Sequence, residues 1–353
     1  MKKTLALLLA LLLCLGLFAA CTATPDNNGG DTTKPETTTA PDAGTDDEVS
    51  LSTDPVRVFT LQGPTGMGMA KLMHDSAAGD AALNYQFTVA SAPDEFTGDI
   101  LQQNFEIAAV PTNLAAVLYA KTEGAVSVAA VNTMGVLHIL ENGDTINSIE
   151  DLAGKTVYSS GQGQVPEYAL NYILDAYNIE CEVIYEGSHD EVATALLTGT
   201  ATVAVLPEPK VTATLANAEK PEGLREALDL TEAWNDACVK KGDDSALYMG
   251  CIIVNNAWAA EHPAEVAAFL AEYKASIDFI SEDLTTAAEY MAAEGIIPAA
   301  KVAEKATPGA NIVYVDGEEM AKGLAGFYEV LYSYNPAAVG GSVPDTAIYY
   351  SAK

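Results

Sequence analysis

Positive charge is scarce in this sequence. Its 353 residues include 17 lysines and arginines against 49 aspartates and glutamates, so the formal net charge at pH 7 is −32. Binding to DNA, RNA or anionic lipid through charge needs clustered basic side chains that neutralise phosphates. The composition therefore excludes these partners on electrostatic grounds, and we expect no nucleic-acid partner. The acidity mainly keeps the protein soluble.

Catalytic and metal-binding motifs are also missing. The chain has only four histidines, and its sequence contains no HExxH helix, no GxSxG elbow and no Walker loop. Nothing in the sequence therefore argues for catalysis, and we expect no enzyme activity, no cofactor and no metal site. Helix ends are predicted for His74, His189 and His262, and a position within a strand is predicted for His138.

Cysteine is rare, and no two cysteines have CxxC spacing. Cys14 lies in an apolar N-terminal segment and Cys21 directly follows that segment. The other three, Cys181, Cys238 and Cys251, cannot all pair within the chain. A bridge between Cys238 and Cys251 is left open by the sequence. Cys181 and Cys251 lie in apolar, strand-like runs, which favours buried thiols, since free cysteine behaves as a small hydrophobe.

The N-terminus carries an export pattern. Leu5–Phe18 is apolar, follows two lysines and is too short to span a membrane comfortably, so residues 1–20 are predicted to be a signal peptide. The sequence LFAAC ending at Cys21 resembles a bacterial lipoprotein cleavage site, in which Cys21 would carry the lipid. A plain secretory signal is the alternative. Residues 21–54 hold almost no aliphatic side chains and predict a disordered tether.

Two glycine-rich turns each follow a predicted strand and precede a predicted helix. The first lies within Val56–Met73 and the second within Lys155–Tyr177. Glycine allows close backbone approach, and the first N–H groups of a helix favour anionic or carbonyl groups. One such turn is ordinarily a simple strand-to-helix connection, but two facing turns would form a cleft.

Three further predicted strands end in small polar residues or proline. Pro111–Asn113, Asn132–Met134 and Pro207–Pro209 follow apolar runs. In open α/β sheets, ligands bind at the carboxyl ends of the strands. Thr112 or Asn113 is alternatively an N-cap of the next helix. Glu208, held between two prolines, is either a ligand acceptor or a solvated turn residue.

The order of these elements resembles the solute-binding receptors of bacterial ABC importers. The passages that carry the resemblance are QGPTGMG, SIEDLAGKTVYSSGQGQ, TGTATVAVLPEPKVT and HPAEVAAFLAEY, and the nearest group is the nitrate, sulfonate, taurine and thiamine-precursor type. The resemblance implies a type II periplasmic-binding-protein fold, α/β in class, with two lobes and a ligand cleft between them. Lobe one would comprise residues 55–145 and 237–353, and lobe two residues 146–236.

The resemblance also implies the partners and the site. The partners would be a small-molecule ligand, ABC permease subunits and the membrane, through a lipid on Cys21. The loops of the implied site contain no nearby lysine or arginine, which disfavours a nitrate or sulfonate ligand and favours a nitrogen-bearing one that donates to Glu208. The implied ligand contacts are Gln62, Gly63, Pro64, Thr65, Gly66, Pro111, Thr112, Asn113, Asn132, Thr133, Met134, Ser160, Gly161, Gln162, Gly163, Gln164 and Glu208.

Two other functions stay open at this point. An enzyme on the same two-lobed fold would need a converging acid–base pair, for which only Glu208 is a candidate. A tethered surface protein without a transport role would need no glycine-rich turns. The sequence does not identify the ligand.

Replacement of Cys21 tests the predicted anchor. Cys21→Ser removes the only atom that could carry the lipid, so we expect the protein to be released into the medium or to remain unprocessed. Membrane fractionation of cells that express the wild-type and variant chains measures this. Unchanged membrane retention of the processed variant would contradict lipidation at Cys21.

Overall fold

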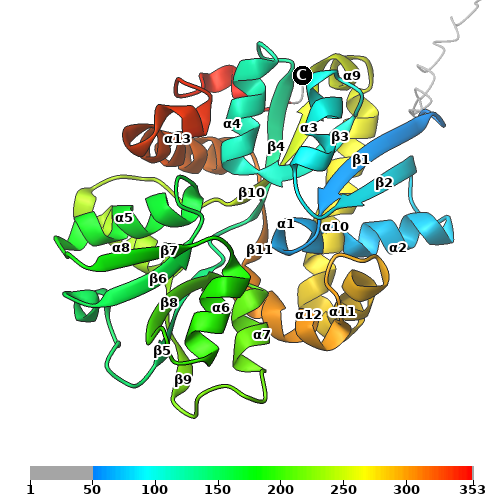
Figure 1. Cartoon of the computed structure of the whole chain (residues 1–353). Coiled ribbons are helices and arrows are strands. Elements are labelled where there is room, and N and C mark those ends of the chain that lie inside the picture. Colours follow the sequence, from blue (N-terminus) through cyan, green and yellow to red (C-terminus); the bar gives the residue numbers. More distant parts are fainter. Residues whose placement is uncertain (1–50, 352–353) are drawn as a thin grey trace, which may run out of the picture. The chain divides into compact units, whose positions relative to one another are not determined.

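The computed structural model describes residues 51–351, so the predicted signal peptide, Cys21 and most of the predicted tether lie outside the described residues. The described chain folds into two mixed β-sheets flanked by helices (Figure 1). The α/β fold class predicted from the sequence is confirmed. Both sheets belong to one compact unit of the chain.

The first sheet has six strands in the order β11-β4-β10-β3-β1-β2. β1 is parallel to β2 and β3, whereas β10 runs antiparallel between β3 and β4. β4 and β10 are buried along their whole length, which explains why their sequences do not alternate between apolar and polar residues. The strands are β1 Pro55–Leu61, β2 Asn84–Ala90, β3 Ile107–Pro111, β4 Val126–Thr133, β10 Gly250–Asn255 and β11 Ile312–Val315.

The second sheet has five strands in the order β7-β6-β8-β5-β9. β6 is parallel to β7 and β8, and β5 is antiparallel to β8 and β9. The strands are β5 Leu137–Asn142, β6 Thr156–Ser160, β7 Glu182–Glu186, β8 Val203–Pro207 and β9 Leu224–Asp229.

The helices cover the faces of both sheets. In α10, Val266, Phe269 and Tyr273 recur at helical spacing and are buried on one face of the helix. No helix among residues 51–351 is long and apolar enough to cross a membrane. The helices are α1 Pro64–Met67, α2 Ala70–Ala78, α3 Asp94–Leu101, α4 Thr112–Lys121, α5 Val165–Tyr177, α6 His189–Leu197, α7 Lys210–Leu215, α8 Leu230–Lys241, α9 Asn256–Glu261, α10 Pro263–Glu282, α11 Leu284–Ala293, α12 Ala300–Ala306 and α13 Gly317–Tyr334, with 3₁₀ turns η1 Ile149–Leu152, η2 Thr307–Ala310, η3 Pro336–Val339 and η4 Thr346–Ile348.

The predicted boundaries of lobe two need correction at both ends. β5 pairs with β8 and β9 in the second sheet, although we expected residues up to 145 in lobe one. The boundary expected between residues 236 and 237 falls inside α8, which packs against α5 and β5 of the second sheet. The chain therefore passes from the first sheet to the second at residues 134–136 and returns after α8. An apolar run alone does not reveal to which sheet a strand belongs.

The end of the predicted tether is fixed on the body. The backbone N–H of Ser52 donates to Glu265 Oε1 at 2.8 Å, and the side-chain amide of Asn84 donates to the carbonyl of Thr53 at 3.2 Å. The tether that we expected to extend to residue 54 therefore ends before these contacts.

Gly135 lies where the chain passes between the two sheets. Its carbonyl accepts hydrogen bonds from Thr231 Oγ1 at 3.0 Å and from Asn311 Nδ2 at 2.6 Å. A Cβ at this position would lie 2.3 Å from Thr231 Oγ1 and 2.7 Å from a methyl carbon of Leu247. A glycine is required here because two neighbouring segments leave no space for a side chain.

We expect Gly135→Ala to lower the free energy of unfolding by about 1–3 kcal/mol, because the added methyl group overpacks the crossing. Gly98→Ala in α3 is the matched control, since a Cβ there meets nothing within 4 Å. Alanine is the better helix former, so this control should be neutral or stabilising by about 0.5–1 kcal/mol. Denaturant unfolding of both variants measures the difference. Equal midpoints for Gly135→Ala and wild type would contradict this account of the crossing.

Candidate functional site

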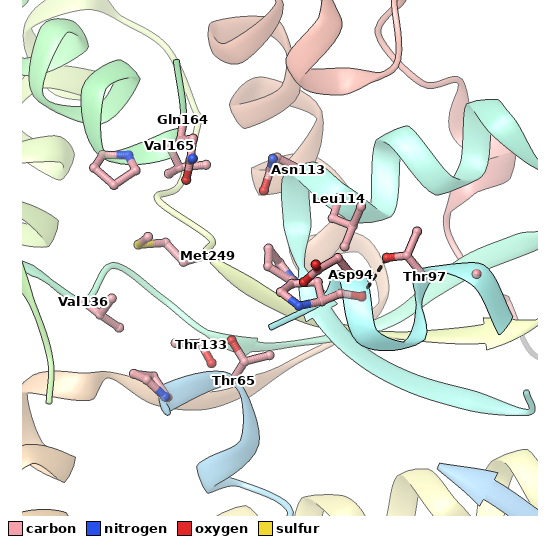
Figure 2. A pocket seen from close by; sticks show the side chains of 15 residues that line it. Thr65, Asp94, Thr97, Asn113, Leu114, Thr133, Val136, Gln164, Val165 and Met249 are labelled. Atoms are coloured by element: carbon pink, nitrogen blue, oxygen red, sulfur yellow. Dashed lines mark hydrogen bonds between the residues drawn. The ribbon is translucent and has the colours of Figure 1, made fainter. Parts of the chain in front are cut away.

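A cavity of about 680 Å³ lies between loops of the two sheets. Its walls include residues that follow β1, β3 and β4 in the first sheet and residues that open α5 after β6 in the second (Figure 2). We call it the first cavity. Six of the residues predicted from the sequence line it: Pro64, Thr65, Pro111, Asn113, Thr133 and Gln164.

No motif in the sequence indicated the other residues of the first cavity. One group comes from the start of α3, which follows β2; β2 is parallel to β1, so its carboxyl end lies at the same edge of the sheet. The loop after β2 could have been identified because β2 ends at the same edge of the sheet as β1. The missed residues are Pro93, Asp94, Thr97, Gly98, Leu114, Val136, Val165, Pro166 and Met249.

A second cavity, of about 510 Å³, adjoins the first through the shared residues Pro64 and Val136. The predicted residues Gln62, Gly63 and Glu208 line it together with His189 and Lys210, which were not predicted. The Lys210 ammonium is 2.5 Å from Asp190 Oδ1, so its charge is already paired within the protein.

The remaining predicted residues line neither cavity. Asn132 is buried and supports the site from behind, because its side-chain amide donates to the carbonyl of Thr65 at 3.0 Å and to the hydroxyl oxygen of Tyr273 at 2.9 Å. The buried Thr112 hydroxyl donates to the carbonyl of Tyr248. The residues in this group are Gly66, Thr112, Asn132, Met134, Ser160, Gly161, Gln162 and Gly163.

The N–H groups of the two glycine turns are largely bonded within the protein. In the first turn, Gly63 N–H donates to the carbonyl of Ile296 and Gly66 N–H to the carbonyl of Gly63. In the second turn, Gly163 N–H donates to Glu167 and Gln164 N–H to the carbonyl of Gly161. These four N–H groups are therefore not open donors for an anion.

Ser160 is connected to the second cavity through a histidine. Its hydroxyl oxygen is 2.5 Å from Nδ1 of His189, the first residue of α6. Burial lowers the pKa of His189, and the charge of Lys210 lowers it further. The ring is therefore neutral at pH 7 and has a single N–H to donate.

Glu208 is buried, with 6% of its surface exposed. Its carboxylate accepts from the backbone N–H of Thr212 at 3.1 Å and from the hydroxyl of Thr212 at 2.9 Å. Burial raises the pKa of Glu208, and the bonds from Thr212 and the nearby His138 act in the opposite direction. The alternative that Glu208 is a solvated turn residue is therefore wrong.

His138 joins the second sheet to the segment that precedes β11 of the first sheet. The ring is 2% exposed; Nδ1 is 2.9 Å from Glu226 Oε1 in β9, and Nε2 is 3.0 Å from the carbonyl oxygen of Gly309 in η2. A neutral imidazole has only one N–H, so only the protonated ring donates to both acceptors. Burial opposes the charge, but the bonds to Glu226 and Gly309 outweigh it and raise the pKa of His138.

None of the three cysteines in residues 51–351 is in a disulfide. Cys238 and Cys251 are buried free thiols, and Cys181 is partly exposed. The bridge between Cys238 and Cys251 that the sequence left open is therefore not formed. Cys251 is buried as predicted, whereas Cys181 is only partly covered.

Two α/β lobes with a cavity between the ends of their strands define the periplasmic-binding-protein fold. The structure of the periplasmic aliphatic sulphonate binding protein SsuA from Escherichia coli has this fold; it is 13% identical, with a TM-score of 0.66 over 86% of this chain and 94% of SsuA. Residues 112–287 match the model of the NMT1/THI5-like family. The predicted resemblance and the predicted fold are both confirmed.

Two other solved structures have the same fold. An ABC transporter protein from Parabacteroides distasonis is 21% identical, with a TM-score of 0.69 over 84% of this chain and 99% of that one. The ligand-binding component of an ABC-type import system from Staphylococcus aureus is 13% identical, with a TM-score of 0.58 over 84% of this chain and 98% of that one. No curated protein sequence matches this chain.

The His138 contacts generate a pH-dependent prediction. Because the folded pKa of His138 is raised above the ordinary value of about 6.5, its contribution to stability is complete below about pH 6.5. The contribution is lost as the pH rises through the folded pKa. The pKa of Glu226 is lowered, chiefly by its bond to His138, so its own contribution fades only in acid, below about pH 4.5.

We therefore expect His138→Gln to destabilise the protein by about 1.5–3 kcal/mol near pH 6, since bonds to a charged group are lost. The difference from wild type should shrink as the pH is raised above the folded pKa. Urea unfolding at a series of pH values from about 6 to 9 measures it. His74→Gln is the control, because His74 stacks on Tyr290 in the first lobe, away from this contact. A pH-independent difference for His138→Gln would contradict a protonated ring.

Proposed function

We propose that this protein is an extracytoplasmic solute-binding receptor, which captures a small molecule in the first cavity and delivers it to an ABC import permease. The observation that carries the proposal is a cavity of about 680 Å³ walled by loops of both sheets. Small-molecule pockets in proteins measure about 300–1,000 Å³ and are mostly apolar with a few polar groups. Closure of two lobes around a ligand is the usual signal for delivery in this architecture.

The matching family and the described roles of the neighbouring structures support the receptor role. The match to the NMT1/THI5-like family covers the second lobe and parts of the first. The three neighbouring structures are an ABC transporter protein, a periplasmic sulphonate binding protein and the ligand-binding component of an ABC-type importer. All three are binding components or transport proteins, which favours binding over catalysis. The predicted signal peptide and lipidated Cys21 would place the receptor at the outer face of the cytoplasmic membrane.

The ligand contacts that we propose are the predicted residues that line a cavity. In the first cavity these are the threonine, asparagine and glutamine side chains Thr65, Asn113, Thr133 and Gln164, beside Pro64 and Pro111. In the second cavity they are Gln62, Gly63 and Glu208. The first cavity contains no lysine, arginine or histidine, so the sulphonate ligand named for the E. coli protein is not carried over to this chain.

A thermal-shift screen of the full chain tests the receptor function. The panel contains amino acids, alkanesulfonates, pyrimidines and polyamines, and at a hundred times its Kd a true ligand stabilises the native state by about 2.7 kcal/mol. We expect at least one class to raise the Tm by several degrees.

A matched pair of variants locates the binding site. Gln164 lines the first cavity and Gln162, in the same turn, does not. We expect Gln164→Ala to weaken binding of the panel ligand roughly two- to tenfold, as loss of one hydrogen bond would, and Gln162→Ala to leave it unchanged. No stabilisation by any panel member would contradict the receptor function, and equal affinities for both variants would contradict this location.

A further inference from the structure

Asp94 is the only charged residue among the 15 that line the first cavity. It is the first residue of α3, and Figure 2 shows it beside Leu114 and Thr97, across the cavity from Gln164 and Val165. No lysine, arginine or histidine lines this cavity to balance the carboxylate. A ligand that enters the first cavity therefore meets one negative charge and no positive side chain.

The carboxylate of Asp94 has no structural partner within residues 51–351. Its neighbour Glu95 satisfies the start of α3, because Glu95 Oε1 accepts from the N–H groups of Ser91 at 2.9 Å and Ala92 at 3.0 Å, and from the Ser91 hydroxyl. In the described part of the chain, Asp94 makes no side-chain hydrogen bond and no ion pair. The hydrogen bonds at the helix start are thus made by Glu95. Asp94 is exposed and contributes only its charge to the positive end of α3, so its carboxylate oxygens are left available to a ligand.

Two of the uncharged polar groups of the cavity, Thr97 and Thr133, can only accept hydrogen bonds from a ligand. The hydroxyl of Thr97 donates to the carbonyl of Pro93 at 2.8 Å, and that of Thr133 donates to Asn132 Oδ1 at 2.9 Å. A hydroxyl has only one proton, so towards the cavity these two groups can only accept. Together with Asp94 they present acceptors, which an ammonium group matches and a sulfonate does not.

The rest of the wall is apolar and would accommodate a hydrocarbon body. Leu114, Val136 and Met249 line the cavity together with several prolines. Figure 2 shows Met249 and Val136 on the opposite side of the cavity from Asp94 and Leu114. A ligand with a charged end at Asp94 would place its apolar part against these side chains.

We propose that Asp94 is the specificity-determining residue of the site, and that it selects an organic cation, an ammonium group attached to an apolar body. This inference rests on the proposed receptor function and deepens it. The ammonium donates charge-assisted hydrogen bonds to Asp94, and the apolar body leaves water for the wall formed by Leu114, Val136 and Met249. The net charge of −32 adds a long-range attraction for cations and a repulsion for anions.

Calorimetric titration with two matched probes tests the inference. The probes are n-butylammonium chloride and sodium butane-1-sulfonate, which share the apolar body and differ in the sign of the charge. They are titrated into the full chain, into Asp94→Asn and into Asp99→Asn. Asp99 is exposed on the same helix and does not line the cavity, so its variant controls for a general loss of negative charge.

We expect wild type to bind butylammonium and not butanesulfonate. Asp94→Asn should weaken butylammonium binding about tenfold or more, as loss of a charge-assisted hydrogen bond would, and Asp99→Asn should leave it unchanged. The Tm of each unliganded variant shows whether it is folded.

Three results would overturn the inference. Equal affinity of folded Asp94→Asn and wild type for butylammonium would remove Asp94 from ligand selection. Stronger binding of butanesulfonate than of butylammonium would show an anion site and would leave the receptor function intact. Absence of binding for both probes, while another solute of the screening panel binds, would likewise refute an organic-cation site without refuting the receptor.

Discussion

The geometry of the site depends on the short crossing between the two sheets. Residues 134–136 leave the first sheet after β4 and enter β5 of the second, and Gly135 is packed against Thr231 and Leu247 with no space for a side chain. Asn311, just before β11, bonds the carbonyl of Gly135 and so ties a distant segment of the first lobe to the crossing. Val136, the next residue, lines both cavities. The crossing at residues 134–136 therefore connects the lobes and, through Val136, also contributes to the wall of both cavities.

A second contact between the lobes depends on charge. The protonated ring of His138 donates to Glu226 within the second sheet and to the carbonyl of Gly309 in the segment that precedes β11. Glu208 lies close enough for its charge interaction with His138 to lower the carboxyl pKa, although burial raises it overall. The buried carboxylate that borders the second cavity is therefore linked electrostatically to a contact between the lobes.

Much of the fold was predictable because it is encoded locally. The strand, glycine turn and helix from Val56 to Met73 follow from β-branched residues, glycines and helical spacing, and the structure contains β1, α1 and α2 there. Sheet membership was not predictable in this way, because it depends on long-range pairing. β5 was assigned to the wrong lobe, and β11, with only four residues, was not predicted at all.

The site was predictable in part, for a related reason. Thr65, Asn113, Thr133 and Gln164 follow strands or glycine turns that the sequence marks clearly, and they line the first cavity. The sequence did not show that Asn132 would turn inward to hold the Thr65 carbonyl, since neighbouring residues at a strand end point to opposite faces. It also did not distinguish Asp94 from Glu95, which differ in whether the carboxylate is bonded within the protein.

We propose above all that a small solute binds between the two lobes at the strand ends of both sheets. A crystal structure of the protein with the solute that gives the largest thermal shift tests this claim most directly. We expect electron density for the solute in the first cavity, in contact with Thr65 or Asn113 from the first lobe and with Gln164 from the second. Density for the solute on an outer face of one lobe, with the first cavity holding only water, would contradict it.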